Sequence, residues 1–236
     1  GGIGNTTLAG TVYKAEREKF DCHAWVSISQ TYTREDVLRR LIIELFRDKH
    51  NVPSNIATMD TTAMQEELRM FLEQKRYLVT LDDVWAPEAY TDLFGALPPN
   101  LKGSRIIITT RIADVAHLAF PDQRILTLEP LSKDESWKLF CKKAFPDREC
   151  PAELQTLSEQ IVCRCEGLPL AIVSIGSLLF VRNKTLEEWR RIHDQLSWEI
   201  INNPRLDHVR NVLHLSFIYL PTYLKSCFLY CALFPE

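Results

Sequence analysis

The feature that most constrains the fold is a series of apolar runs that are separated by segments with helical periodicity. Each run is rich in β-branched or aromatic residues and lacks strict alternation, which is typical of parallel strands covered on both faces. The runs are Ala24–Ile28, Tyr77–Leu81, Arg105–Thr109 and Arg124–Leu128. Between the first two runs, apolar residues recur at helical spacing in residues 37–46 and 64–72. Residues 1–131 are therefore predicted to form an α/β domain with a parallel sheet.

The pattern changes after Leu131, where strand-like runs give way to helical patterns. Two segments match a capping box at a helix start, namely Ser132-x-x-Glu135 and Thr185-x-x-Glu188. Gly167 is placed to end one helix, and Pro169 is tolerated in the first turn of the next. The sequence predicts a helical subdomain over residues 132–203, followed by the start of a third unit over residues 204–236.

The chain begins with a glycine-rich turn that matches most of the phosphate-binding pattern G-x-x-x-x-G-K-[ST]. The turn reads Gly1-Gly2-Ile3-Gly4-Asn5-Thr6-Thr7-Leu8. In that pattern, backbone N–H groups wrap the phosphates, the lysine reaches the outer phosphates and the hydroxyl holds magnesium. Asn5 occupies the lysine position, and the helical pattern that follows places the turn at a helix N-terminus, where anions are favoured. The first glycine of the pattern would precede residue 1, so we expect a sheet that lacks its first strand.

Two polar segments follow predicted strands and provide candidate ligands for a nucleotide and its metal. Asp82 and Asp83 come directly after the run that ends at Leu81, and Arg111 follows the next strand. Magnesium prefers one or two carboxylates together with substrate phosphates, so Asp82 is the predicted metal ligand. Asp83 is then placed to position or deprotonate a water molecule, and the planar fork of Arg111 suits a terminal phosphate. The alternative for Asp82 and Asp83 is a solvated acidic turn, and the alternative for Arg111 is an ordinary surface charge.

Composition excludes several functional classes. The formal net charge of −3 comes from scattered charges, so the electrostatic footprint of a nucleic-acid-binding protein is missing. The seven cysteines lack the spacing of a disulfide framework or a zinc site, which favours a reducing compartment and predicts a cytoplasmic protein. The longest apolar stretch, Leu168–Val181, is shorter than the roughly 20 residues needed to cross a bilayer.

Taken in order, the segments resemble the NB-ARC domain of plant disease-resistance proteins, the NLR immune receptors. Seven segments carry the resemblance: Gly1–Leu8, Phe20–Gln30, Tyr77–Trp85, Gly103–Arg111, Leu128–Phe140, Gly167–Ala171 and Cys227–Glu236. The motif Leu81-Asp82-Asp83-Val84-Trp85, which ends in tryptophan, resembles the corresponding motif in the coiled-coil branch of the family. The resemblance implies a P-loop NTPase fold, a helical subdomain and the start of a winged-helix subdomain. It also implies an upstream coiled-coil domain and downstream leucine-rich repeats in the parent protein.

The resemblance implies a switch that binds ADP or ATP with Mg²⁺ and self-associates on activation. In this interpretation Thr6 and Asp82 hold the metal, Arg111 contacts the terminal phosphate and Pro169 packs against adenine. The inner phosphates would be bound by Thr7 together with the loop residues Gly2, Ile3, Gly4 and Asn5. Hydrolysis is slow in proteins of this kind, so the output is a conformation.

Two residues depart from the family pattern. Asn5 replaces the lysine of the loop, which predicts weakened nucleotide binding, and Thr80 replaces an aliphatic residue in a strand. Two further hypotheses stay open beside the switch. One is a scaffold or pseudogene-derived fragment that no longer uses nucleotide, and the other is a slow P-loop ATPase.

Overall fold

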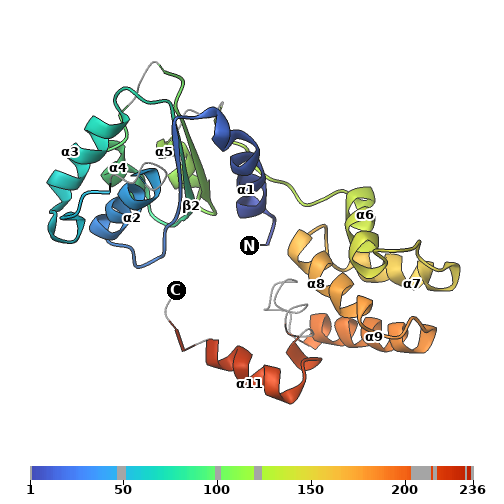
Figure 1. Cartoon of the computed structure of the whole chain (residues 1–236). Helices are drawn as coiled ribbons and strands as arrows, with labels where there is room; N and C mark the ends of the chain where they lie inside the picture. The colour runs from blue at the N-terminus through green and yellow to red at the C-terminus, as the bar shows by residue number, and fades with distance from the viewer. Residues whose placement is uncertain are drawn as a thin grey trace. The chain divides into compact units, whose positions relative to one another are not determined.

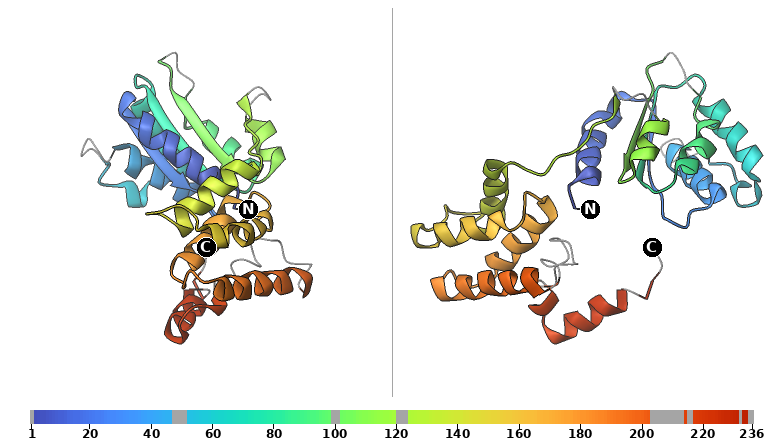
Figure 2. Two further views of the ribbon diagram at one scale, coloured as in Figure 1. Left: turned by 90° about the vertical axis from the view of Figure 1, so that its right-hand side faces the viewer. Right: turned by 180° about the vertical axis from the view of Figure 1, so that it is seen from behind.

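The computed structural model describes residues 2–46, 52–98, 102–119, 124–202, 214, 217–231 and 233–234. The chain divides into two compact units (Figures 1 and 2). One unit contains Asn5–Thr127, and the other contains Gly1–Gly4 and Leu128–Pro235. None of the helices that the structure describes combines the length and the hydropathy needed to span a membrane.

The unit formed by Asn5–Thr127 is built on a parallel three-stranded sheet in the order β1-β2-β3. Its strands are β1 (Cys22–Ser27), β2 (Tyr77–Val84) and β3 (Arg105–Thr110). Its helices are α1 (Asn5–Glu16), η1 (Arg17–Lys19), α2 (Arg34–Phe46), η3 (Ile56–Thr58), α3 (Thr61–Leu72), α4 (Pro87–Phe94) and α5 (Ala113–Ala119). This parallel α/β arrangement confirms the predicted P-loop fold class.

The two faces of the sheet are covered differently. Helix α1 packs on one face, where the Tyr13 ring meets the His23 and Trp25 rings edge-on at 5.6 and 5.4 Å between centroids. The other face packs against α2, α3 and α4, as Figure 1 and the rear view of Figure 2 show. That side holds the main core, in which Leu38, Leu41 and the residues around them are fully buried.

The prediction of a fourth strand at Arg124–Leu128 is wrong. Residues 125–130 belong to no strand among the residues that the structure describes, and the Leu126 side chain is 73% exposed. An apolar β-branched run predicts an extended backbone, but a strand also needs a hydrogen-bonded neighbour. This segment fills no sheet position next to β3 in the described chain, so it forms no ladder.

In the second unit, the described residues from 133 onward form helices joined by turns and loops. Its helices are α6 (Lys133–Ala144), α7 (Ala152–Cys163), α8 (Pro169–Phe180), α9 (Leu186–Asn202) and α11 (Thr222–Cys231). The capping box at the start of α6 is present, with the Ser132 side chain accepting from the Glu135 N–H and Glu135 accepting from the Ser132 N–H. Phe140, Trp189 and Phe145 form the aromatic centre of its core. Burial raises the pKa of the Cys165 thiol in this core to about 12, which keeps it protonated at neutral pH.

Gly10 lies inside α1, where glycine lowers helix stability. A Cβ added there would meet the Trp25 ring at 3.7 Å, an ordinary van der Waals contact. We therefore expect Gly10→Ala to raise the free energy of unfolding by about 0.5–1 kcal/mol in denaturant titrations. Gly176, also inside a helix, is the matched control, because its added Cβ would lie 2.8 Å from the Lys143 Cβ. Stabilisation by Gly176→Ala and loss of stability on Gly10→Ala would contradict this packing account.

Candidate functional site

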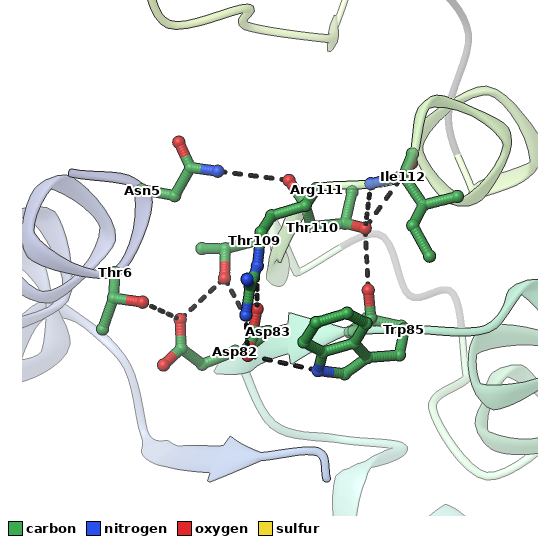
Figure 3. A network of polar contacts seen from close by, with 10 residues as sticks. Asn5, Thr6, Asp82, Asp83, Trp85, Thr109, Thr110, Arg111 and Ile112 are labelled. Atoms are coloured by element: carbon green, nitrogen blue, oxygen red, sulfur yellow. Dashed lines mark hydrogen bonds and ion pairs between the residues drawn. The ribbon is translucent and has the colours of Figure 1, made fainter. Parts of the chain in front are cut away.

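The centre of the candidate site is the Asp82 carboxylate near the carboxyl end of β2 (Figure 3). One oxygen, Oδ1, accepts hydrogen bonds from the Thr6 hydroxyl at 3.0 Å and the Thr109 hydroxyl at 2.6 Å. Asp82 is buried with 5% of its surface exposed, whereas Thr6 lies in the exposed first turn of α1. Side chains from α1 and β3 therefore both donate to one carboxylate of the central strand β2.

A β-bulge explains why two consecutive carboxylates serve the same site. The pairing of β2 with β3 is regular up to Leu81, which lies opposite Ile108, and then shifts so that Val84 lies opposite Thr110. Within this shift Asp83 adopts a left-handed backbone with φ 56°, and its N–H donates to the Thr109 hydroxyl at 2.8 Å. Successive side chains of a regular strand point to opposite faces. The bulge re-aims Asp83, so both carboxylates enter the network drawn in Figure 3.

Asp83 pairs with Arg111 immediately after β3. Arg111 donates from Nε to Oδ1 at 3.2 Å and from Nη2 to Oδ2 at 3.0 Å, a bidentate pair. Trp85 donates from its indole N–H to Asp83 Oδ2 at 3.1 Å, and the Arg111 guanidinium lies 4.2 Å from the Trp85 ring centroid. These three side chains form one cluster beside Asp82.

Asn5, at the position of the expected lysine, makes a structural contact. Its amide nitrogen donates to the Thr110 carbonyl oxygen at 3.1 Å, which joins the first residue of α1 to the last residue of β3. The Thr110 hydroxyl in turn donates to the Val84 carbonyl at 2.7 Å. The side chain is neutral and short, so this position contributes no positive charge to the site.

The glycine turn and Pro169 belong to the second unit, which does not contain Asp82 or Arg111. Gly2 and Gly4 have left-handed backbones with φ 82° and 107°, conformations that glycine adopts without strain. The Gly2 carbonyl accepts a hydrogen bond at 3.1 Å from the N–H of Leu170, the residue after Pro169 in the first turn of α8. That Pro169 packs against adenine stays a prediction.

Comparison with known proteins identifies the family. The family model described as NB-ARC domain matches residues 1–150, more than half of the chain. The chain belongs to the NB-ARC domain family. Among its relatives in Arabidopsis thaliana it is 41% identical to disease resistance protein RPM1, 38% identical to disease resistance protein RPP8 and 37% identical to disease resistance protein RPH8A. Each comparison covers the whole chain but only 26%, 27% and 27% of the relative, so the chain spans about a quarter of their length.

Membership of the NB-ARC family implies nucleotide binding, and the donor set around Asp82 fits the magnesium ion that accompanies a nucleotide. Among the described residues no group of three or more His, Cys, Asp or Glu side chains could hold a metal by itself. Magnesium, however, needs only one or two carboxylates when phosphates and water complete its shell. The Thr6 hydroxyl and the Asp82 carboxylate lie within hydrogen-bond distance at 3.0 Å, and both are oxygen ligands of the kind that would hold magnesium.

Sequence reasoning missed two residues that contact the candidate site residues. Thr109 was placed at a strand end without a role, although it donates to Asp82 and accepts from the Asp83 N–H. Trp85 served only to distinguish branches of the family, although it contacts both Asp83 and Arg111. The position of Thr109 at the end of a strand beside β2 was a usable signal. The contacts of Trp85 depend on the bulge, which the sequence does not mark.

Proposed function

We propose that the chain is the nucleotide-switch module of a plant immune receptor, with nucleotide affinity weakened by Asn5. The observation that carries the proposal is the meeting of the Thr6 hydroxyl with the buried Asp82 carboxylate at the strand ends, with Arg111 close by. In open α/β sheets, ligands bind beyond the carboxyl ends of the strands. The disease resistance relatives support the biological setting.

Each residue of the proposed site has a separate task. Thr6 and Asp82 hold Mg²⁺, which when bound neutralises phosphate charge. Arg111 binds the terminal phosphate of ATP through its planar fork, and Pro169 packs against adenine. The inner phosphates are bound by Thr7 and by the loop residues Gly2, Ile3, Gly4 and Asn5.

The switch operates through different contacts of ADP and ATP with two arrangements of the same domains. Only ATP carries the phosphate that reaches Arg111, so only ATP favours the state in which Arg111 is available. Asp83 is the group that would position a water molecule during slow hydrolysis. Because the contacts differ between the two nucleotides, exchange of one for the other shifts the population of states.

The parent protein supplies the remaining parts of the receptor. We assign residues 1–131 to the nucleotide-binding subdomain, 132–203 to the helical subdomain and 204–236 to the start of a winged-helix subdomain. A coiled-coil domain upstream, leucine-rich repeats downstream and self-association on activation complete this proposal. The proposed location is the cytoplasm.

Two other functions remain as alternatives. One observation favours a scaffold without nucleotide: the Asn5 amide donates to the Thr110 carbonyl and so joins α1 to β3, which leaves that hydrogen unavailable to a phosphate. A slow ATPase is favoured by Asp83, whose carboxylate lies beside the proposed metal ligand. Phosphate release above the level of an Asp83→Asn variant would support the ATPase.

Equilibrium titration of ADP into the chain tests the switch against the scaffold. The helix N-terminus and the Thr6–Asp82 pair should give a dissociation constant of about 1 µM or weaker in the presence of Mg²⁺. The affinity lost through the missing lysine should be larger for ATP than for ADP, because that lysine mainly serves the outer phosphates. An absence of heat and of competition at millimolar concentrations of both nucleotides would favour the scaffold.

A further inference from the structure

Arg111, the proposed ligand of the terminal phosphate, contacts two protein side chains through one edge and one face of its guanidinium in this structure. Two of its N–H groups are used on the two Asp83 oxygens, and one face of its guanidinium lies 4.2 Å from the Trp85 ring centroid. A carboxylate and a phosphate bind the same bidentate edge of a guanidinium. Asp83 therefore occupies the edge of Arg111 that a phosphate would need.

Trp85 connects to both members of the ion pair. Its indole N–H donates to the same Asp83 oxygen that accepts from Arg111 Nη2, while its ring lies against the guanidinium (Figure 3). Each of the three side chains thus contacts the other two. Removing the indole would weaken the hold on Asp83 and on Arg111 together.

The cluster is suited to opening because it is accessible to water. The Arg111 and Asp83 side chains are 47% and 39% exposed, so their attraction is screened and worth little by itself. The cation–π contact with Trp85 adds a contribution of similar size. Asp83 also has a left-handed backbone, a conformation that is uncommon for residues other than glycine and tends to occur at switch regions.

We propose that Trp85 and Asp83 form a latch that withholds Arg111 from the terminal phosphate, with Trp85 as its positioning residue. The proposal rests on the proposed function, since it concerns the regulation of that same site. ADP, which lacks the terminal phosphate, leaves the latch closed. ATP must displace Asp83 from Arg111, so its apparent affinity is reduced in proportion to the fraction of molecules in which the latch is open.

The spectroscopic test follows the indole N–H resonance of Trp85 in ¹⁵N-labelled chain. The resonance is identified as the one lost in Trp85→Phe. Arg111→Lys should move it without nucleotide, because lysine has neither the planar face nor the bidentate fork. A non-hydrolysable ATP analogue should move it, whereas ADP should leave it in place. The latch would be overturned if the chemical shift of the Trp85 resonance did not change in Arg111→Lys, or if it changed equally with both nucleotides.

The binding test measures affinity for the same two nucleotides in Trp85 variants. Trp85→Leu should tighten binding of the ATP analogue by roughly three- to tenfold and leave ADP affinity unchanged. Trp85→Phe keeps a ring but loses the N–H, so its effect should be smaller in the same direction. Phe20→Leu is the matched control, because it removes a ring that lies 4.7 Å from another guanidinium, that of Arg76; it should change neither affinity.

The outcomes separate this proposal from the proposed function. Weaker binding of the analogue to Trp85→Leu would show that Trp85 presents Arg111 to the phosphate, which contradicts the latch while nucleotide binding stands. ADP binding together with an affinity for the ATP analogue that is the same in all Trp85 variants would also overturn the latch alone. Failure of every variant and of the unmodified chain to bind either nucleotide would overturn both proposals together.

Discussion

Replacing Asn5 by lysine should tighten ADP binding by about 10- to 150-fold. A lysine ammonium adds a full charge and charge-assisted hydrogen bonds worth roughly 1.5–3 kcal/mol, and about 1.4 kcal/mol corresponds to tenfold in affinity. In the structure the Asn5 amide is neutral and donates to the Thr110 carbonyl, so it offers little to a phosphate. The gain should be larger for ATP than for ADP, as measured by calorimetric titration of both.

Asn5→Ala separates the new charge from the lost hydrogen bond. Alanine removes the amide that bonds Thr110 without adding a cation, so it should lower stability slightly and leave ADP affinity nearly unchanged. A lysine variant that binds ADP no better than the alanine variant would show that this position does not set the affinity of the module.

Gly167→Ala should destabilise the helical unit by roughly 2–5 kcal/mol. Gly167 has a left-handed backbone with φ 73°, and an added Cβ would lie 2.4 Å from the Leu131 carbonyl oxygen and 3.0 Å from the Leu131 nitrogen. Those are backbone atoms held in place by the Leu131 N–H, which donates to the Gly167 carbonyl at 2.9 Å. The left-handed backbone costs about 1–2 kcal/mol and the clash about 1–3 kcal/mol.

Gly103→Ala is the control for the backbone conformation alone. Gly103 has φ 83°, but the nearest atom to its added Cβ is the Arg76 Nε at 3.7 Å. Its substitution should therefore cost only about 1–2 kcal/mol. Denaturant titrations of both variants would measure the difference. Equal losses, or a smaller loss at Gly167, would mean that the close approach to Leu131 does not constrain this turn.

Local signals in the sequence predicted much of the architecture. The box formed by Ser132 and Glu135 places the start of α6 within one turn of chain, because capping uses neighbouring residues. Asp82 and Arg111 could be assigned to the same edge of the sheet because parallel strands end on the same side. The carboxyl ends of β2 and β3 do meet there, while the roles of these residues remain proposals.

The remaining details depend on contacts between distant parts of the chain. The bulge that turns Asp83 toward Arg111 arises from a shift in pairing between β2 and β3, and no local pattern encodes it. Asn5 bonds Thr110, a residue 105 positions away. The run Arg124–Leu128 has the composition of a strand but makes no ladder with the described sheet, because propensity specifies extension and not a partner.

The most direct test of the central claim is the magnesium dependence of ADP binding to the chain and to Asp82→Asn. Asparagine keeps the shape of Asp82 and can still accept from the Thr6 and Thr109 hydroxyls, but it removes the charge that a hard cation requires. Asp60→Asn is the matched control, since Asp60 caps α3 and asparagine caps helices equally well. We predict that Mg²⁺, compared with EDTA, tightens ADP binding to the unmodified chain and to Asp60→Asn but not to Asp82→Asn. An equal response to Mg²⁺ in all three proteins would contradict the assignment of Thr6 and Asp82 as the metal site.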